Sequence, residues 1–235
     1  MPKPRVALSW SGGKDAALAL LRIAPTHNIQ LLLTNLSPGP GRVTMHGIAP
    51  ELIAAQAEEL GLPLRFIQPE TADNAGYEAA TLAAYAQLKA EGIGQVVFGD
   101  IFLEDLRQYR EALLQKAGLE GFYPLWKENT TKLANELLRR GISTRICAAS
   151  DRWFTEEDAG ALFSAAFLNQ LPPRVDPCGE NGEFHTFVTH HPMFGAPVAV
   201  RPGKALHKQY PSPEEGKAPV GFWFRELLPA LNEQP

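Results

Sequence analysis

The chain has 235 residues, of which 45% are hydrophobic and 20% charged, so it can bury a sizeable core in one large domain or two small ones. Its formal net charge of -4 gives no general attraction to nucleic acid or to an anionic membrane. Two cysteines, Cys147 and Cys178, are too few for a disulfide framework or a zinc site of their own. No stretch approaches a membrane span, and the apolar start is too short for a signal peptide. We therefore expect a soluble cytoplasmic protein with no membrane partner.

The first half of the chain alternates between strand and helix patterns. Apolar runs predict strands over 5–9, 30–36, 64–67 and 95–99. Segments with an apolar helical face predict helices over 15–24, 51–60, 77–91 and 103–117. Strands that are separated by helices indicate an α/β fold with a doubly wound parallel sheet.

The pattern loosens after residue 100, and residues 122–126, which contain a proline, are the candidate domain junction. The remaining residues predict helices over 130–140 and 156–169 and a strand over 143–148. Two short β-like runs follow, at 186–188 and 197–200. The sequence thus predicts two domains, residues 1–124 and residues 125–235.

The most informative segment is Ser9-Trp10-Ser11-Gly12-Gly13-Lys14-Asp15, between the first predicted strand and the first predicted helix. A glycine turn at a helix start can hold phosphate, because free N–H groups and the helix dipole point at the anion. Lys14 adds a positive charge. The segment is neither a Walker loop nor a dinucleotide fingerprint, and such a tripeptide alone more often marks an ordinary tight turn. Its place in the first strand-to-helix turn favours a ligand site.

A second unusual segment runs from Cys178 to Phe187. It places Glu180 and Glu183 around two glycines, with His185 two residues after the second acid. If 183–188 is a strand, Glu183 and His185 share one face. Such a group could hold Mg²⁺, orient an amine or move a proton, and a solvated hairpin turn with incidental charges explains the segment equally well.

Together the two segments resemble one family. The Ser-Gly-Gly-Lys-Asp loop looks like the PP-loop of the N-type ATP pyrophosphatases, and the whole chain is similar to the diphthine–ammonia ligase family, in the version of its bacterial branch. The further residues that carry this resemblance are His46-Gly47, Gly99-Asp100, Pro124-Leu125-Trp126 and 179–188. The last segment, Gly-Glu-Asn-Gly-Glu-Phe-His-Thr, is the most specific of them.

The resemblance implies a PP-loop ATP-binding domain over 1–124 and a smaller C-terminal α/β domain over 125–235 that holds the acceptor. It implies an AMP-forming amide ligase: ATP adenylates a carboxylate, pyrophosphate leaves, and ammonia displaces AMP. The acceptor in this family is diphthine, and bacteria lack diphthamide, so a bacterial member would use another carboxylate acceptor. ATP and Mg²⁺ are the implied cofactors, and a homodimer is a reasonable expectation.

The resemblance also assigns roles to residues of this sequence. The residues expected to bind the nucleotide are Ser9, Ser11, Gly12, Gly13, Lys14, Asn35, His46, Gly47 and Gly99. The residues expected to be catalytic are Lys14, Asp15, Asp100, Glu180, Glu183 and His185. Asp15 and Asp100 are the expected Mg²⁺ ligands. Arg107 and Arg110, one helical turn apart, could contact phosphate, although a solvated helix face is the simpler interpretation.

The chain departs from the family pattern at three positions. Ala16 stands where a serine is common, so the loop would depend more on its backbone and on Lys14. Asn181 replaces a glycine, and His185 takes a place often held by an acid.

Two other functions remain open at this point. A nucleotide-binding regulatory module without catalysis would use the same fold, and Ala16 favours it while the acidic segment at 180–185 does not. A PP-loop enzyme that modifies RNA is disfavoured by the acidic charge balance and by the lack of a paired-cysteine motif.

Overall fold

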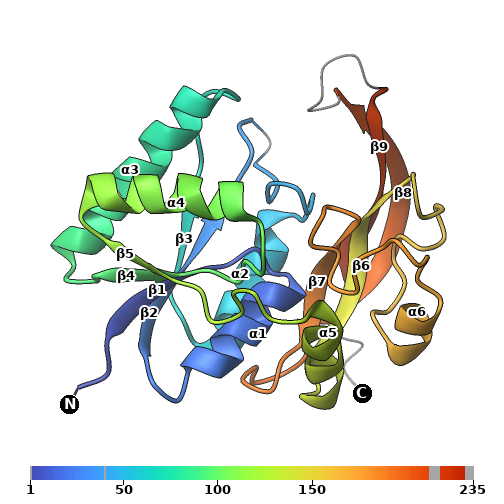
Figure 1. The fold of residues 1–235 in the computed structure, drawn as a ribbon, viewed down its shortest axis with the longest axis horizontal. Helices are drawn as coiled ribbons and strands as arrows, with labels where there is room; N and C mark the ends of the chain where they lie inside the picture. The colour runs from blue at the N-terminus through green and yellow to red at the C-terminus, as the bar shows by residue number, and fades with distance from the viewer. Residues whose placement is uncertain (1, 40, 212–217, 231–235) are drawn as a thin grey trace.

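The computed structural model describes residues 2–39, 41–211 and 218–230. The first half forms a five-stranded parallel sheet in the order β3-β2-β1-β4-β5 (Figure 1). Its strands are β1 (Arg5–Ser9), β2 (Asn28–Asn35), β3 (Leu64–Ile67), β4 (Gln95–Val97) and β5 (Glu120–Phe122). Its helices are α1 (Lys14–Ile23), α2 (Pro50–Leu60), α3 (Asn74–Ala90) and α4 (Glu104–Ala117). The predicted doubly wound parallel sheet is confirmed.

Both faces of this sheet are covered by helices, which explains why its central strands are apolar throughout. On β1, Val6 and Leu8 belong to the buried cluster that contains residues of α1 and α2. Ala7 points to the other face, into the cluster formed with α3 and α4. The chain adds β2 and β3 on one side of β1, then β4 and β5 on the other. A crevice at the carboxyl ends of β1 and β4 is therefore the expected ligand site.

The second half forms a four-stranded antiparallel sheet in the order β7-β6-β9-β8. Its strands are β6 (Ser143–Ser150), β7 (Phe184–His190), β8 (Val200–Tyr210) and β9 (Val220–Pro229), and its helices are α5 (Thr130–Arg139) and α6 (Ala165–Asn169). This confirms a separate, smaller C-terminal unit. The last strand of the first sheet ends at Phe122 and α5 begins at Thr130, so the boundary proposed between residues 124 and 125 falls in the connection.

The helix predicted over 156–169 is wrong in its first two thirds. Only Ala165–Asn169 is helical, and the Ser164 side chain caps it by accepting a hydrogen bond from the Phe167 amide at 3.2 Å. The preceding residues lie along β6 instead: the Gly160 amide donates to the Ile146 carbonyl, and the Phe163 amide donates to the Thr144 carbonyl. Pairing with a strand edge has overridden the local helical pattern.

Three strands, β5, β8 and β9, lie almost entirely outside the predicted runs. β5 is only three residues long and lies in the stretch where the pattern loosens. β8 starts where the predicted run at 197–200 ends, and most of its residues are exposed. β9 follows residues 212–217, which lie outside the described part of the chain. β8 is an exposed edge strand that needs no apolar face, so its sequence carries little signal, whereas the aromatic run Phe222–Phe224 of β9 was a signal that could have been used.

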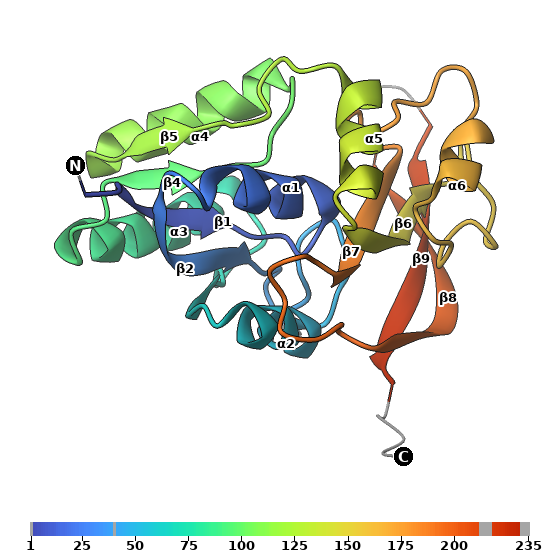
Figure 2. The same ribbon diagram turned by 90° about the horizontal axis from the view of Figure 1, so that it is seen from below.

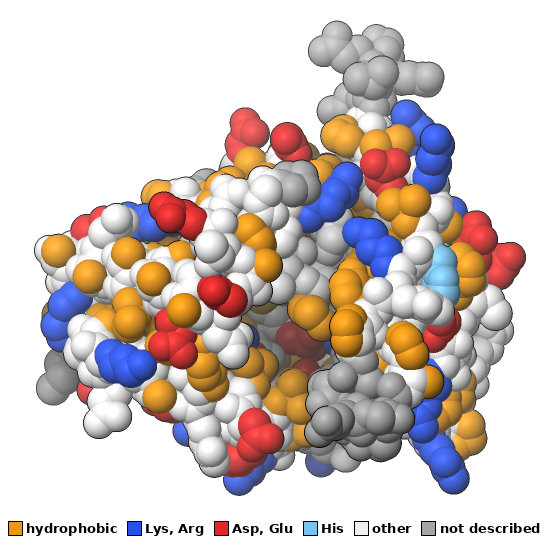
Figure 3. All heavy atoms as spheres, turned by 90° about the horizontal axis from the view of Figure 1, so that it is seen from above, with side chains coloured by type: hydrophobic (Ala, Val, Ile, Leu, Met, Phe, Trp, Pro, Cys, Tyr) orange, Lys and Arg blue, Asp and Glu red, His pale blue; other side chains and the backbone are white. Residues whose placement is uncertain are grey.

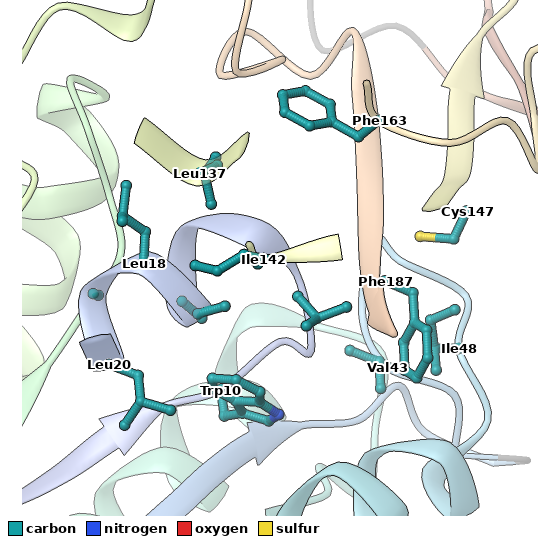
Figure 4. Packing of buried hydrophobic residues seen from close by; sticks show 14 of the residues in the cluster. Trp10, Leu18, Leu20, Val43, Ile48, Leu137, Ile142, Cys147, Phe163 and Phe187 are labelled. Atoms are coloured by element: carbon teal, nitrogen blue, oxygen red, sulfur yellow. The ribbon is translucent and has the colours of Figure 1, made fainter. Parts of the chain in front are cut away.

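The two halves share one buried core. Figure 2 shows α1 at their junction, beside α5 and β7. Leu18 and Leu20 of α1 belong to the same buried cluster as Leu137 and Ile142 of the second half (Figure 4). In the same view Phe187 of β7 lies beside Val43 and Ile48, which follow β2. The glycine loop before α1 is therefore held between two packed units.

Candidate nucleotide and acceptor site

A cavity of about 630 Å³ opens at the carboxyl ends of the parallel strands and is lined by residues of both halves. Figure 3 shows the molecule hollowed between its halves, with acidic side chains deep in the hollow and apolar side chains around it. Ten residues of the predicted site line it: Ser9, Ser11, Lys14, Asp15, Asn35, His46, Gly99, Asp100, Glu180 and His185. Segments far apart in the sequence thus converge on one hollow.

The loop before α1 has its backbone partly occupied by contacts with β7. The Lys14 amide donates to the Thr186 hydroxyl oxygen at 3.0 Å, and the Val188 amide donates to the Gly12 carbonyl at 2.8 Å. Among the described residues, the amide of Ala16 has no acceptor, and the amide of Asp15 has only the carboxylate of its own side chain. These are first-turn donors of α1, the groups that an anion uses at a helix N-terminus.

Two glycines of the site are required by close approach. A Cβ on Gly13 would lie 2.8 Å from His46 Cε1 and 3.1 Å from the Thr186 carbonyl oxygen. A Cβ on Gly99 would lie 2.7 Å from the Asp15 carbonyl carbon. The end of β4 therefore packs directly on the first turn of α1, and His46 packs directly on the loop.

Lys14 is 2% exposed and anchors the loop to the second half. Its Nζ lies 2.7 Å from an Asp15 carboxylate oxygen and also donates to the Cys178 carbonyl. Burial by itself lowers the pKa of Lys14, but the attraction of Asp15, with smaller contributions from Cys178 and Glu180, leaves the pKa raised. Lys14 is therefore a fixed cation at the bottom of the cavity.

Glu180 lies on the opposite wall, in the turn before β7. Its Oε1 accepts hydrogen bonds from the amides of Ile101 at 2.8 Å and Phe102 at 3.3 Å. Burial, helped by the nearby Asp15 charge, raises the pKa of Glu180 to about 7. A carboxyl group with this pKa can take up or release a proton near neutral pH.

His46 and His185 face each other with ring centroids 4.8 Å apart. Burial lowers the pKa of His46 to about 4 and that of His185 well below the usual value, so both imidazoles are neutral. His46 Nδ1 lies 3.0 Å from the Thr186 carbonyl oxygen and must carry the proton there. Among the described residues, His185 Nε2 and Asn35 Oδ1 are buried without a partner.

Asp100 forms an ion pair with Arg110 of α4, with Arg110 Nε 2.7 Å from Asp100 Oδ2. Arg110 lines the cavity and does not lie on a solvated helix face, which had been the simpler interpretation of its sequence pattern. Arg107 lies one turn earlier on α4, outside the cavity, and its guanidinium carbon is 4.6 Å from the ring centroids of Tyr123 and Trp126. It lines a separate, open depression of about 810 Å³ that contains none of the predicted site residues.

Four predicted residues do not line the cavity: Gly12, Gly13, Gly47 and Glu183. The three glycines shape the segments that do. Glu183 is 4% exposed, and its carboxylate accepts hydrogen bonds from the Asp176 amide, the Asn181 amide and the Asn181 side chain. β7 begins at Phe184, so Glu183 does not share a strand face with His185. These hydrogen bonds hold the turn that carries Glu180, and the catalytic role expected for Glu183 stays a prediction.

The expected Mg²⁺ ligands are Asp15 and Asp100, and each is paired with a cation, Lys14 or Arg110. Within the described ranges, no three His, Cys, Asp or Glu side chains form a group that could hold a metal. Mg²⁺ is usually bound by one or two carboxylates together with substrate phosphates. Two carboxylates that line the same cavity fit that mode, in which Mg²⁺ is held jointly with the nucleotide.

Sequence reasoning missed residues that fix the site from behind. Gln56 of α2 is fully buried: its Oε1 accepts from Trp10 Nε1 at 2.9 Å, and its Nε2 donates to the carbonyls of Gly12 and Val188. His191 is also fully buried, and its Nε2 donates to the Ala17 carbonyl at 3.1 Å. The one signal for these residues in the sequence was a glutamine within the apolar stretch of α2, which indicates a buried polar side chain with partners.

The chain matches the family model described as diphthamide synthase N-terminal domain over residues 4–121, half of its length. It is 26% identical to the rat protein named diphthine–ammonia ligase over 227 residues, which cover 86% of this chain and 85% of the rat protein. The human protein of that name is 26% identical over 83% of this chain and 82% of its own length. The Schizosaccharomyces pombe protein is 24% identical over 78% of this chain, which spans about a third of that longer relative.

A solved structure of a Methanocaldococcus jannaschii protein, described as a predicted subunit of a tRNA methyltransferase, is 15% identical and has a TM-score of 0.41. The match covers 61% of this chain and 80% of that one, and likeness at this level carries no argument about function. No helix in the described part of the chain is long and apolar enough to cross a membrane. The loop, the cavity and the family match agree: the chain belongs to the diphthamide synthase family, a family of ATP-dependent PP-loop ligases.

Proposed function

We propose that this protein is an AMP-forming amide ligase that joins ammonia to a carboxylate acceptor. The acceptor carboxylate attacks the α-phosphorus of ATP, which gives an acyl adenylate and pyrophosphate. Ammonia then attacks the acyl carbon, AMP leaves, and one proton is released as the amide forms. The observation that carries the proposal is the convergence of Lys14, the glycine loop and Glu180 on one cavity.

The loop and Lys14 are suited to the first step. The amides of Asp15 and Ala16 can hold phosphate oxygens, and the Lys14 ammonium can stabilise the negative charge that develops on departing pyrophosphate. Mg²⁺, bound jointly by the nucleotide and by Asp15 or Asp100, would add positive charge to the phosphates. Ala16 has no hydroxyl to offer, so backbone donors carry more of the binding here.

Glu180 is suited to the second step. Ammonia that has attacked an acyl carbon must lose a proton, and a carboxylate with a pKa of about 7 can accept it at neutral pH. His46 and His185 are neutral and act as hydrogen-bonding groups rather than as cations. In this proposal residues 1–124 bind ATP, and residues 125–235 bring Glu180 to the acceptor.

The relatives named above are called diphthine–ammonia ligases. From that name we extend to this chain only the formation of an amide bond between ammonia and a carboxylate. The structure adds no basic strip at the cavity that would suit RNA: the cations lining it are Lys14 and Arg110, and each is paired with an acid. A small carboxylic acid or a modified side chain is the acceptor class that fits.

The test is a product analysis with ATP, Mg²⁺, ¹⁵N-ammonium and a pool of carboxylic acids. We expect a ¹⁵N-labelled amide in equal amount to AMP, found by mass spectrometry. Lys14→Gln should abolish it, whereas Lys132→Gln, on an exposed position of α5, should not. Tight ATP binding without turnover on any acid would contradict the proposal and support a nucleotide-binding regulatory module.

A further inference from the structure

The cavity has two chemically different ends, one on each side of the glycine loop. The loop follows β1, and β1 lies between β2 and β4 in the sheet. Residues that follow β2, such as Asn35 and His46, therefore reach the cavity from one side. Residues that follow β4, from Gly99 to Arg110, reach it from the other side. Two ligands can thus meet above the loop.

The end on the β2 side is polar but carries no formal charge. Asn35 Oδ1 and His185 Nε2 are buried there without partners among the described residues. Buried polar groups without a partner are costly, and a ligand that supplies the missing hydrogen bonds recovers that cost. A neutral heterocycle with donors and acceptors, such as a nucleobase, matches this end.

The end on the β4 side combines apolar surface with one cation. Tyr77 of α3 and Tyr109 of α4 stack with ring centroids 6.2 Å apart, and Leu103 and Leu106 complete the apolar wall. Leu103 is 37% exposed, which is high for a leucine that lines a cavity. An aliphatic or aromatic group of a ligand could cover this surface.

The cation at this end is Arg110, which presents a free edge to the cavity. Asp100 lies along the edge formed by Nε and Nη2: Nη2 donates to Oδ1 at 3.3 Å, and Nε lies 2.7 Å from Oδ2 in an ion pair that lacks the geometry of a hydrogen bond. The ring of Phe98 lies behind the guanidinium, 4.6 Å from its central carbon. Nη1 has no acceptor within the described residues. A guanidinium that is held along one edge and stacked on one face is preorganised to bind an oxyanion through its remaining N–H groups.

We propose that Arg110 anchors the carboxylate of the acceptor, and that the acceptor is a carboxylic acid with an apolar or aromatic body lying on Tyr77, Tyr109, Leu103 and Leu106. This inference rests on the proposed ligase function and deepens it. Arg110 is held beside the loop by Asp100, so it offsets the repulsion between an acceptor carboxylate and the phosphates of ATP. Asp100 acts as a positioning residue for the guanidinium.

The test measures binding of 4-phenylbutyrate, and of its neutral amide 4-phenylbutyramide, to the protein saturated with α,β-methylene-ATP and Mg²⁺. Isothermal calorimetry should detect the acid and show at least tenfold weaker binding of the amide. Arg110→Gln should weaken binding of the acid at least tenfold and change the affinity for the ATP analogue less than threefold. Arg110→Lys, which keeps the charge, should retain part of the acid binding.

Arg107→Gln is the matched control, because Arg107 lies on the same helix but outside the cavity, and it should bind both ligands as the wild type does. Equal binding of the acid by Arg110→Gln and the wild type would overturn the inference. Equal binding of acid and amide, or no acid binding by the nucleotide-loaded wild type, would also overturn it. Failure of the wild type to bind the ATP analogue would instead reject the proposed ligase function.

Discussion

The backbone amide of Lys14 donates a hydrogen bond of 3.0 Å to the hydroxyl oxygen of Thr186, 172 residues later in the chain. The glycine loop is thus capped by a side chain of the second sheet and not by a residue of its own helix. The N-cap residue, Gly13, has no side chain to do this. The first turn of α1 therefore adopts its shape only when both halves are packed together.

Thr186→Val should destabilise the protein and weaken ATP binding together. The substitution keeps the shape of a side chain that is 2% exposed but leaves the Lys14 amide without its acceptor. A buried donor left unsatisfied costs about 1–3 kcal/mol. Urea unfolding and ATP calorimetry measure the two effects.

Thr189→Val on the same strand is the control for this change. Thr189 is partly exposed, and its hydroxyl donates to the Ser143 carbonyl at 3.2 Å, away from the loop. We expect unchanged ATP affinity for Thr189→Val. If both variants bind ATP equally well, the contact between Lys14 and Thr186 does not shape the phosphate site.

Gln56→Leu should be among the most destabilising single changes in α2. The Gln56 side chain forms hydrogen bonds with Trp10 Nε1 and with the carbonyls of Gly12 and Val188. Leucine cannot replace any of these three bonds. The Gly12 carbonyl still accepts from the Val188 amide, so Trp10 Nε1 and the Val188 carbonyl lose the most. We expect a loss of about 2–4 kcal/mol in the free energy of unfolding. Gln87→Leu, at an exposed position of α3, should change it by less than about 0.5 kcal/mol. A similar small effect for both would show that Gln56 does not clamp the loop.

Glu180→Gln should remove amide synthesis and make the protein more stable above neutral pH. The pKa of Glu180 is about 7 in the folded chain, against 4.5 for an ordinary glutamate side chain. The stabilising effect of the protonated carboxyl is therefore complete below pH 4.5 and is lost as the pH rises through 7. Glutamine retains an oxygen for the amides of Ile101 and Phe102 without the buried charge.

Unfolding of Glu180→Gln and wild type should be compared at pH 5 and pH 8. The variant should gain on the order of 1–3 kcal/mol at pH 8 and little at pH 5. Glu183→Gln is the contrasting variant and should lose stability, because the Glu183 carboxylate accepts three N–H groups. A gain in stability for Glu183→Gln together with a loss for Glu180→Gln at pH 8 would contradict this expectation.

His191 should make the folded chain sensitive to mild acid. Burial lowers the pKa of His191 to about 4, whereas an unfolded histidine titrates near 6.5. Between these values the unfolded chain binds a proton that the folded chain does not, so stability falls as the pH drops from 6.5 to 4. The loss is up to about 3 kcal/mol. His191→Gln should make the fall in stability less steep but not abolish it, because the pKa values of His46 and His185 are lowered too. An unchanged slope in pH-dependent urea unfolding would contradict this role.

The elements of the parallel sheet could be predicted because each carries its signal locally. The strand predicted over 5–9 is β1, and the helix predicted over 51–60 is α2 with one added proline at its start. The helix predicted over 156–169 failed because residues 160–163 pair with β6, a partner that local periodicity cannot reveal. The strands β8 and β9 were not predicted, because few of their residues are buried.

The site was predicted where glycine and charge patterns mark it, and missed where the contacts are remote. Lys14, Asp100 and Glu180 stood out as motif residues, and they meet in one cavity. Gln56 and Thr186 act on the loop across 44 and 172 residues, and such contacts leave no local pattern. Glu183 stood out as an acidic motif residue, and its hydrogen bonds hold the turn, while its expected catalytic role stays a prediction.

The position at which ATP is cleaved tests the central claim most directly. ³¹P NMR of a reaction with ATP, Mg²⁺, ammonium and an accepted carboxylic acid distinguishes the two possible cleavages. The account predicts AMP and pyrophosphate in equal amounts, with none formed when the acid is omitted. Formation of ADP and inorganic phosphate would contradict it.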